Sequence, residues 1–368
     1  MSIQQAPAEA ATPRLGTGGT LARLVLIGLA LAAVAGVFAY LGGWFAPNRL
    51  TPTRFADGFE EVNGVHPGFR RNHARGVCAT GFFDSNGNGV RLSKAVVFQP
   101  GRVPVLGRLS LNGGQPYAAD TPDAVRGLGL QFSLPNGELW RTAMINLPVV
   151  PVRTPEAFYE LVIAGKPDPQ TGKPDPARMK ELLDRHPETV QALTLIKSQP
   201  FSSGFANSTF HSLHAFRFIN AAGDSVPVRW ILTPLQPFEA ASAAATPPDK
   251  NYLFDALIAQ IHRQPLQWHV VLIVGQPGDP TNDPSAAWPA EREQVDVGTV
   301  TLDRLESDDT SPARDINFDP LVLPAGIAPS DDPFLSARSA VYSQSFTRRS
   351  GEPRQPSPIT PTDVRKGE

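Results

Sequence analysis

The sequence predicts an α+β fold whose core is an antiparallel barrel of about eight strands, surrounded by helices. Three observations support this fold: apolar runs of strand length, turn signals between them, and a high content of glycine and proline. Turn signals such as SNGNG at 85–89, NGG at 112–114 and AAGD at 221–224 give the runs hairpin spacing. The expected strands lie at 94–99, 103–111, 127–134, 139–147, 214–220, 227–234, 268–275 and 294–302.

Helical segments are expected between these strands. Thr154 followed by Pro155 is typical of a helix start, because threonine caps the first turn and proline is tolerated within it. Residues 176–198 and 248–263 also have helical patterns. With 38 prolines and 31 glycines, the chain is rich in turns, so a bundle of long helices is disfavoured.

Composition limits the class of protein. Hydrophobic residues make up 41% of the 368 residues and charged residues 18%, which is enough apolar material for a packed core. The formal net charge is −2, so no long-range field attracts nucleic acid, and no nucleic-acid partner is expected. Cys78 is the single cysteine, which excludes an intramolecular disulfide framework and any multi-cysteine metal site. Its apolar neighbours predict that it is buried.

The first 44 residues are expected to lie outside the folded body. Residues 1–23 are rich in Ala, Gly, Pro and Thr, which predicts a disordered cytoplasmic tail. Residues 24–44 carry no charge and match the roughly 20 apolar residues that a bilayer-spanning helix needs. Because Arg14 and Arg23 precede this run, the rest of the chain is expected on the extracytoplasmic, periplasmic side.

Two alternatives compete with a membrane anchor. A buried core helix is disfavoured because the run is apolar on all faces. A cleaved signal peptide stays open, although the run is longer than a typical signal core and no clean Ala-x-Ala site follows. The expected organisation is a tail at 1–23, a transmembrane helix or signal anchor at 24–44, one globular domain at 51–350, and a flexible, proline-rich tail at 351–368.

Isolated motifs identify no chemistry in this chain. GNG at 87–89 lacks the strand–loop–helix context of a phosphate loop, and neither a G-x-S-x-G nor an H-E-x-x-H motif occurs. His211 and His214 lie three residues apart beside a strand-like run. Since no third ligand is apparent nearby, a metal site at this pair has little support.

Several segments, taken together and in order, resemble the catalase superfamily. FRRNHARG at 69–76, followed by GFF at 81–83, is similar to the segment that holds that family's distal histidine. RLS at 108–110 and VRGLGLQF at 125–132 resemble its Arg-x-Ser and arginine–glycine strand. The longest match is FDP at 318–320, LPAGIAPSDD at 323–332, and Arg338 with Tyr342. Covering about residues 54–349, the resemblance is to the compact catalase-related peroxidases, without the extra arm and domain of large catalases.

The resemblance implies a catalase-type barrel with a buried haem and Tyr342 as the iron ligand. Arg338 lies one helical turn before Tyr342, where a guanidinium stabilises a phenolate by opposite charge. Three arginines match the family's propionate-binding positions, and arginine binds carboxylates bidentately. A phenylalanine matches the position that stacks on the haem. The implied cofactor-binding residues are Arg70, Arg108, Phe158, Arg338 and Arg349.

On the distal side, the resemblance implies that His73 is the general acid/base and that Ser110 bonds its imidazole. A neutral imidazole can take a proton from one oxygen of a peroxide and return it to the other. The family places an asparagine here within Asn-Asn-x-Pro, whereas this chain reads MINLP at 144–148. Aligning on Pro148 puts Ile145 at the asparagine position and Asn146 one residue later, so Asn146 reaches the pocket only if the strand shifts.

These departures favour a peroxidase over a true catalase. A displaced asparagine weakens the handling of a second peroxide, which catalase turnover requires, and Asn72 makes the pocket mouth more polar. The sequence therefore predicts a haem-dependent peroxidase that reduces hydrogen peroxide or organic peroxides with a small organic reductant, with weak catalase activity. The alternatives are a hydroperoxide isomerase or dehydratase of the allene-oxide type and a non-enzymatic, membrane-tethered haem binder. A homo-oligomer stays open.

Overall fold

The computed structural model describes residues 17–42, 49–242 and 249–365. The chain separates into two compact units, Met1–Thr51 and Pro52–Glu368. In the first unit, helix α1 (Thr17–Leu41) contains the segment Gly18–Leu41, which reaches a mean hydropathy of 2.5. Among the described residues it is the one helix long and apolar enough to cross a membrane.

Helix α1 begins earlier than the predicted span at 24–44. Residues 17–23, which were expected in a disordered tail, are helical because Leu21, Ala22 and Arg23 are good helix formers. The large side chains of the helix are exposed, as expected for a surface that would face lipid or a translocation channel rather than a protein core. The predicted tail at 1–16 and the end of the apolar run at 43–44 lie outside the described residues.

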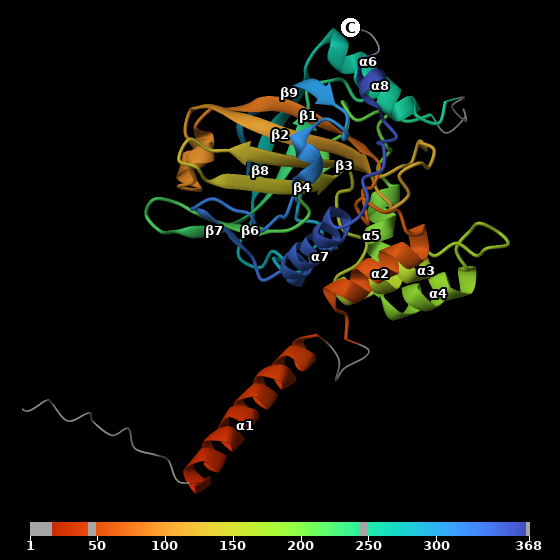
Figure 1. The fold of residues 1–368 in the computed structure, drawn as a ribbon. Helices are drawn as coiled ribbons and strands as arrows, with labels where there is room; N and C mark the ends of the chain where they lie inside the picture. The colour runs from red at the N-terminus through yellow and green to blue at the C-terminus, as the bar shows by residue number, and fades with distance from the viewer. Residues whose placement is uncertain (1–16, 43–48, 243–248, 366–368) are drawn as a thin grey trace, which may run out of the picture. The chain divides into compact units, whose positions relative to one another are not determined.

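In the second unit, eight strands close into an antiparallel barrel (Figure 1). The ring runs β1–β2–β3–β4–β5–β7–β8–β9 and returns to β1, so the predicted α+β barrel is confirmed. Two short strands, β6 (Phe216–Ile219) and β10 (Ile327–Pro329), continue the sheet from β7. The ring strands are β1 (Gly76–Ser85), β2 (Gly101–Leu111), β3 (Arg126–Ser133), β4 (Leu139–Ile145), β5 (Phe210–His211), β7 (Ser225–Pro234), β8 (Leu266–Val274) and β9 (Gln294–Glu306).

Helices flank the barrel. Helix α2 packs against α3 and α7, α3 packs against α4, and α6 packs against α8. Three short 3-10 helices, η1 (Asn88–Arg91), η2 (Val96–Phe98) and η3 (Pro312–Asp315), lie in connections. The α-helices of this unit are α2 (Pro52–Asn63), α3 (Pro155–Ala164), α4 (Pro176–Arg185), α5 (Pro187–Lys197), α6 (Tyr252–Arg263), α7 (Pro333–Ser350) and α8 (Pro361–Val364).

Large aromatic side chains fill the barrel core. Phe132 stacks on Trp140 with ring centroids 4.7 Å apart. The indole nitrogens of Trp230 and Trp268 are satisfied by the Thr142 hydroxyl at 3.2 Å and the Ser208 carbonyl at 3.0 Å. Because buried tryptophans need such partners, the barrel interior is a packed and hydrogen-bonded core rather than a channel.

Two ring strands, β1 and the two-residue β5, lie outside the runs that predict strands. Glycine and small residues dominate the first half of β1, which weakens a strand pattern. A Cβ added to Gly81 would lie 1.9 Å from the Thr301 carbonyl oxygen on β9, so only glycine fits between the two strands. The pairing of β1 with β9 also shifts register at Thr80 and Gly81, a bulge that bends the strand.

Three other predicted elements differ in the structure. The run at 94–99 forms η2 instead of a strand, since a short apolar run does not distinguish strand from helix. The helix predicted at 176–198 is two helices, because Pro187 forces His186 out of the helical conformation. Of the strand predicted at 214–220, only Phe216–Ile219 pairs.

The segment 351–365 packs on the barrel instead of forming a flexible tail. Ile359 is 1% exposed and joins the main core with Val364. The Ser307 hydroxyl donates to the Ile359 carbonyl at 2.6 Å, and Thr360 and Asp363 form a capping box for α8. Apolar side chains spaced by prolines give no periodic signal, so this packing is not visible in the sequence.

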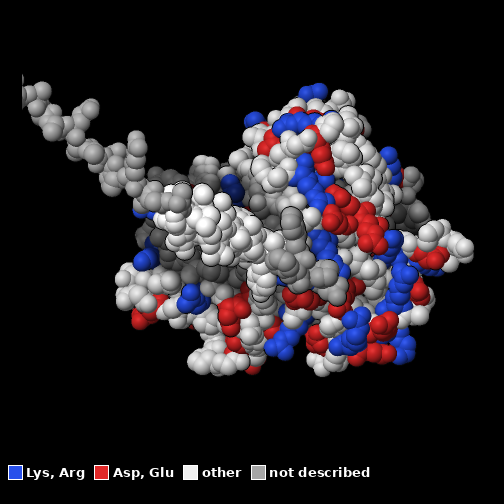
Figure 2. Space-filling model, turned by 60° about the horizontal axis from the view of Figure 1, so that its bottom comes forward, with Lys and Arg blue, Asp and Glu red and all other residues white. Residues whose placement is uncertain are grey.

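Charge on the second unit is mixed. On the face in Figure 2, lysine and arginine lie beside aspartate and glutamate rather than in a separate basic field.

Helix α7 is fixed to the barrel at its first turn. Asp332 caps the helix by accepting from the Phe334 backbone nitrogen at 2.9 Å. Its other oxygen lies 2.7 Å from Nδ1 of His214, and both side chains are 1% exposed. Burial is the largest cause that lowers the pKa of His214 to about 4, so the neutral imidazole donates from Nδ1 to the carboxylate.

Replacing Asp332 by alanine is expected to lower the free energy of unfolding by about 2–4 kcal/mol, since a cap is lost and a buried imidazole N–H is left unpaired. Chemical denaturation followed by tryptophan fluorescence measures the change. The control is Asp175→Ala, which removes an exposed cap of α4 that accepts at 2.8 Å. That variant is expected to lose about 1 kcal/mol. Equal losses in both variants would contradict a role for the buried contact.

Candidate functional site

His73 lies in a turn between α2 and β1, and its backbone is left-handed. Its φ is 55°, which is uncommon for a residue other than glycine. The Asn72 side-chain oxygen accepts from the backbone nitrogens of His73 at 3.0 Å and Gly113 at 2.7 Å. Asn72 therefore shapes the turn that presents His73, a role different from the polar pocket mouth expected from the sequence.

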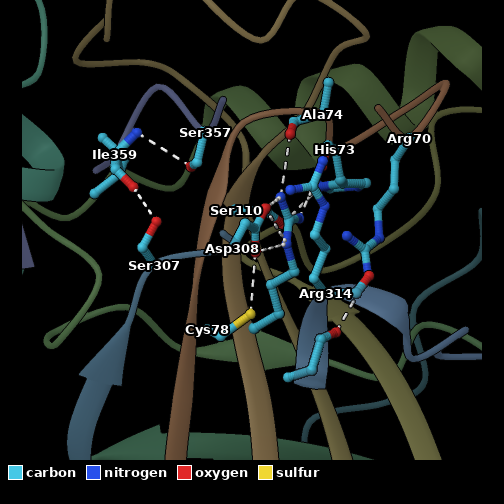
Figure 3. A network of polar contacts seen from close by, with 12 residues as sticks. Arg70, His73, Ala74, Cys78, Ser110, Ser307, Asp308, Arg314, Ser357 and Ile359 are labelled. Carbon is cyan, nitrogen blue, oxygen red and sulfur yellow. Dashed lines mark hydrogen bonds and ion pairs between the residues drawn. The ribbon is translucent and has the colours of Figure 1, made fainter. Parts of the chain in front are cut away.

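The imidazole of His73 lies against two neighbouring strands, β2 and β3. Ser110 Oγ on β2 lies 3.1 Å from Nδ1, so the predicted pair is present (Figure 3). A Cβ added to Gly127 on β3 would lie 2.8 Å from the ring carbon Cε1. Glycine at this position therefore lets the ring lie against the strand.

The electrostatic surroundings of His73 favour its neutral form. Burial is the largest cause, and the guanidiniums of Arg108, Arg338 and Arg70 add to it, lowering the pKa of His73 to about 3. The imidazole is therefore neutral over the physiological range, and one ring nitrogen can accept a proton.

Three predicted arginines, Arg70, Arg108 and Arg349, gather beside His73. Burial, followed by the charges of Arg108 and Arg349, lowers the pKa of Arg70 well below its ordinary value. Burial is also the main cause that lowers the pKa of Arg349 to about 10. Asp308 is the buried carboxylate near them, and a small cavity lies between Arg70, Asp308 and Arg349. Positive charge in excess at such a place favours an anionic ligand.

Arg108 differs from the other two because its guanidinium is already engaged. It pairs with Asp308 at 2.7 Å and donates to the backbone oxygens of His73 at 2.8 Å and Ala74 at 3.1 Å. Arg70, by contrast, donates through Nη2 alone, and its partners are backbone oxygens. The bond from Nη2 to the Arg314 carbonyl oxygen is 2.8 Å long.

Tyr342 and Arg338 lie on the same face of α7, as predicted from their spacing. Arg338 Nη2 donates to the Tyr342 hydroxyl at 3.3 Å and to the Ala143 carbonyl of β4 at 3.1 Å. The guanidinium thus ties the helix to the barrel wall and places positive charge beside the phenol oxygen.

The His73 turn and helix α7 are joined directly. The Arg71 backbone nitrogen donates to the Ser345 hydroxyl of α7 at 3.2 Å. The Arg71 side chain bridges Glu60 of α2 at 2.7 Å and Glu352 just after α7 at 2.9 Å, and Glu352 also accepts from the Gly68 nitrogen at 2.7 Å. These bonds bring the predicted histidine and tyrosine segments into one site.

An apolar wall of half-buried side chains packs at the start of α7. The Phe158 side chain on α3 is half-buried, and its ring centroid lies 6.1 Å from that of Phe334 at the start of α7. Ile145 and Leu161 are also half-buried and pack with it against a cluster that includes Leu213. A half-buried apolar wall beside polar groups is typical of a site that accepts a largely apolar ligand.

Asn146 does not join His73 in this site. Its side-chain oxygen accepts from the Arg126 backbone nitrogen at 2.8 Å, and its side chain lines a separate cavity of about 300 Å³. Ile145 pairs with Gly127, against which the His73 ring lies, so Ile145 shares that face of the sheet. The structure therefore places the isoleucine, and not the asparagine, beside the histidine.

The sequence interpretation missed Asp308, Asp332 and the role of His214. Asp332 falls within the segment 323–332 that matches the family pattern, so a signal for it was present. Asp308 does not, and nothing in the sequence separates it from its neighbour Asp309. His214 is bonded to Asp332 while His211 lines the 300 Å³ cavity, and among the described residues no group of three His, Cys, Asp or Glu could hold a metal ion.

The family model described as catalase matches residues 56–364. A catalase-related peroxidase from Synechococcus elongatus is 39% identical over 330 residues, covering 88% of this chain and 96% of the relative. A second catalase-related peroxidase, from Mycolicibacterium paratuberculosis, is 34% identical and covers 83% of this chain and 96% of the relative.

Solved structures are similar at the level of the fold. A bacterial catalase superposes with a TM-score of 0.68 at 23% identity, covering 77% of this chain and 58% of that one. A fungal catalase gives 0.69 at 20% identity, covering 77% and 60%. The family match over most of the chain, the two relatives and the closed barrel agree with the resemblance of the motifs, and the chain belongs to the catalase family.

Proposed function

We propose that this protein is a haem-dependent peroxidase that reduces hydrogen peroxide or organic peroxides with a small organic donor. The observation that carries the proposal is one site in which the His73–Ser110 pair and the Tyr342–Arg338 pair are joined through Arg71 and Ser345. Family membership and two relatives named catalase-related peroxidase support an oxidoreductase that acts on peroxide.

The residues present fit a haem group. Buried guanidiniums in excess of carboxylates suit the two propionates, which Arg70 and Arg349 would hold. The half-buried wall with Phe158 and Ile145 suits the porphyrin face, and Tyr342 would ligate the iron. When bound, haem iron supplies the electrons that break the O–O bond of a peroxide.

His73 would move the proton in this reaction. Because the imidazole is neutral, it can accept the proton of the peroxide oxygen nearer the iron and return it to the outer oxygen, which then leaves as water. The contact with Ser110 orients the ring for both transfers. The two remaining reducing equivalents and protons would come from two molecules of a one-electron donor.

On helix α7, Arg338 donates to the hydroxyl of Tyr342 and so places its positive charge beside the oxygen that would ligate the iron. The buried bond between His214 and Asp332 fixes the first turn of α7, so the position of the phenol oxygen does not depend on a mobile helix end. Arg338 also holds β4, which carries Ile145.

Ile145 beside His73 favours peroxidase over catalase turnover. Oxidation of a second peroxide needs a polar group to hold it, and an isoleucine side chain offers neither a donor nor an acceptor. A hydroperoxide isomerase or dehydratase would use the same cofactor, but neither relative's name supports it. A passive haem binder needs no neutral imidazole positioned by a hydroxyl, so that alternative is also disfavoured.

The proposed roles of Tyr342 as the iron ligand and His73 as the base can be tested by substitution. The purified protein supplied with haem is expected to show a Soret band, which Tyr342→Phe weakens or abolishes and His73→Ala retains. His73→Ala is expected to lose most of its reaction with peroxide, by about 10²- to 10⁴-fold. Tyr117→Phe is the control, because this tyrosine is exposed and its hydroxyl donates to the Pro356 carbonyl. A wild-type protein without a Soret band would sink the proposed function.

Steady-state assays separate the reaction types. Hydrogen peroxide alone should give little oxygen, and adding a phenolic donor should give coloured product and faster loss of peroxide. Rapid oxygen evolution without a donor would point to a catalase. Loss of a fatty hydroperoxide without oxidation of the donor would point to the isomerase or dehydratase reading.

The second prediction concerns pH. With its pKa lowered to about 3, His73 stays unprotonated, so kcat/KM for hydrogen peroxide should be flat between about pH 5 and pH 8. The unfolded chain takes up this proton near 6.5, so the contribution of His73 to stability falls as the pH drops from 6.5 toward 3. An acid limb with an apparent pKa near 6.5 that His73→Ala removes would contradict a neutral, buried base.

We further propose that α1 anchors the protein in a membrane with residues 51–365 on the extracytoplasmic side. The apolar helix is long enough to span a bilayer. Arg23 lies in its N-terminal part and Arg14 precedes the helix in the sequence, which favours a cytoplasmic N-terminal side. A signal sequence near the N-terminus would have the same length and composition, so cleavage is the competing outcome.

The third prediction concerns this anchor. In a bacterial host, the full chain is expected to stay with alkali-washed membranes, and protease added to spheroplasts should degrade the catalytic domain. A chain lacking residues 17–41 should be soluble and protected inside the cell. A mature N-terminus beyond residue 44 would show a cleaved signal peptide, and protection of the full chain in spheroplasts would reverse the proposed orientation.

A further inference from the structure

Arg108 has almost no free hydrogen-bonding capacity. A guanidinium has five N–H groups. Nε points at both oxygens of Asp308, at 3.0 and 3.2 Å, and Nη2 reaches one of them at 2.7 Å. Nη2 also donates to the Ala74 carbonyl at 3.1 Å, and Nη1 donates to the His73 carbonyl at 2.8 Å. One N–H on Nη1 is left, so a propionate could gain little from Arg108.

Asp308 is held as a buried anion. It lies just after β9, and its side chain is 7% exposed beside an Arg108 side chain that is 3% exposed. Burial is the largest single effect and would raise the pKa of Asp308. The charge and hydrogen bonds of Arg108, together with the charge of Arg70 and the Cys78 thiol, outweigh it, so the pKa is lowered. The Cys78 thiol donates to Asp308 Oδ1 at 3.0 Å (Figure 3).

The two carbonyls that Arg108 holds belong to the turn that presents the imidazole. His73 has a φ of 55°, a conformation that persists only where the surroundings enforce it. Asn72 secures the N–H side of this residue, and Arg108 secures the carbonyl side. A bidentate carboxylate on Nε and Nη2 leaves the guanidinium one orientation, because its fork is planar and rigid.

We propose that Asp308 is a positioning residue for His73: it fixes Arg108, and Arg108 fixes the backbone that aims the imidazole into the site. This inference rests on the proposed haem peroxidase function and gives Arg108 a role different from the propionate contact that the resemblance implies. Arg70 and Arg349 remain the arginines of the anion site.

Cyanide binding to the haem-loaded full chain tests this role without turnover. Hydrogen cyanide must give its proton to a base in the pocket before the anion binds ferric iron, so the association rate reports the position of His73. Asp308→Asn is expected to keep the Soret band and to slow cyanide association by about ten- to a hundredfold, since small misplacements of a catalytic group have effects of that size. The first step with hydrogen peroxide should slow by a similar factor.

A double-mutant cycle separates positioning from a general loss of stability. If Asp308 acts through Arg108, then Asp308→Asn should have little further effect in a chain that already carries Arg108→Gln. The matched control is Asp279→Asn, which breaks a bidentate pair with Arg292, at 2.8 Å for both bonds, in the loop after β8. That variant is expected to bind cyanide at the wild-type rate.

A second readout needs no haem. In the haem-free chain, Asp308→Asn should speed amide hydrogen exchange in a peptide covering 70–76, and Asp279→Asn should not. If the wild type binds no haem, the proposed function fails, and this exchange measurement alone decides whether Asp308 orders the turn.

Three results would overturn the inference: a wild-type cyanide rate in Asp308→Asn, equal slowing in Asp308→Asn and Asp279→Asn, or additive effects in the cycle. If Asp308→Asn does not fold, Arg108→Lys replaces it, because lysine keeps the ion pair but cannot also reach both carbonyls. A wild-type rate of cyanide binding in Arg108→Lys would then overturn it, and slowed binding with an intact Soret band would support it.

Discussion

The site depends on how the chain accommodates buried guanidinium groups. A charge removed from water needs a partner, and breaking such a pair is costly. Three arginines in or beside the His73 turn each pair with a carboxylate from a distant segment. These pairs hold the turn against the segments that follow β9 and α7 and against the β2–β3 connection. The pairs are Arg71 with Glu352, Arg75 with Asp120 and Arg108 with Asp308. Arg70 donates to backbone carbonyls, and Arg349 donates to the Arg314 carbonyl and lies 3.5 Å from the half-exposed Asp315. Buried positive charge is therefore left in excess at one place, where an anionic group would complete the balance.

Much of the barrel is visible in the sequence, because most ring strands are apolar runs bounded by glycine-rich turns. Two ring strands are not visible: β5 has only two residues, and β1 is rich in small residues where it pairs with β9 at Gly81. The site residues divide in the same way, into those that sequence motifs predict and those that they do not. The His73–Ser110 and Arg338–Tyr342 pairs follow from motifs that keep their order along the chain. Asp308 could not be found, because its partner lies 200 residues away and only the β1–β2 and β1–β9 pairings bring the two together.

The position of Ile145 shows how one residue of register changes the chemistry of a pocket. Neighbouring residues of a strand face opposite sides, so Ile145 faces the histidine while Asn146 bonds the Arg126 backbone. An amide one residue earlier would have placed a donor and an acceptor beside the imidazole. The aliphatic side chain leaves His73 and Ser110 as the polar pair there, which suits a single peroxide molecule and an external reductant.

The bonds from Glu352 to Arg71 and Gly68 join residues 281 and 284 positions apart. During synthesis, the turn that presents His73 leaves the ribosome long before α7 and Glu352 have been made. The bonds that complete this turn therefore form only after the segment that carries Glu352 has been made. The site is completed late, once residues 351–365 have docked on the barrel, and a chain that terminated before residue 333 would have neither these bonds nor helix α7.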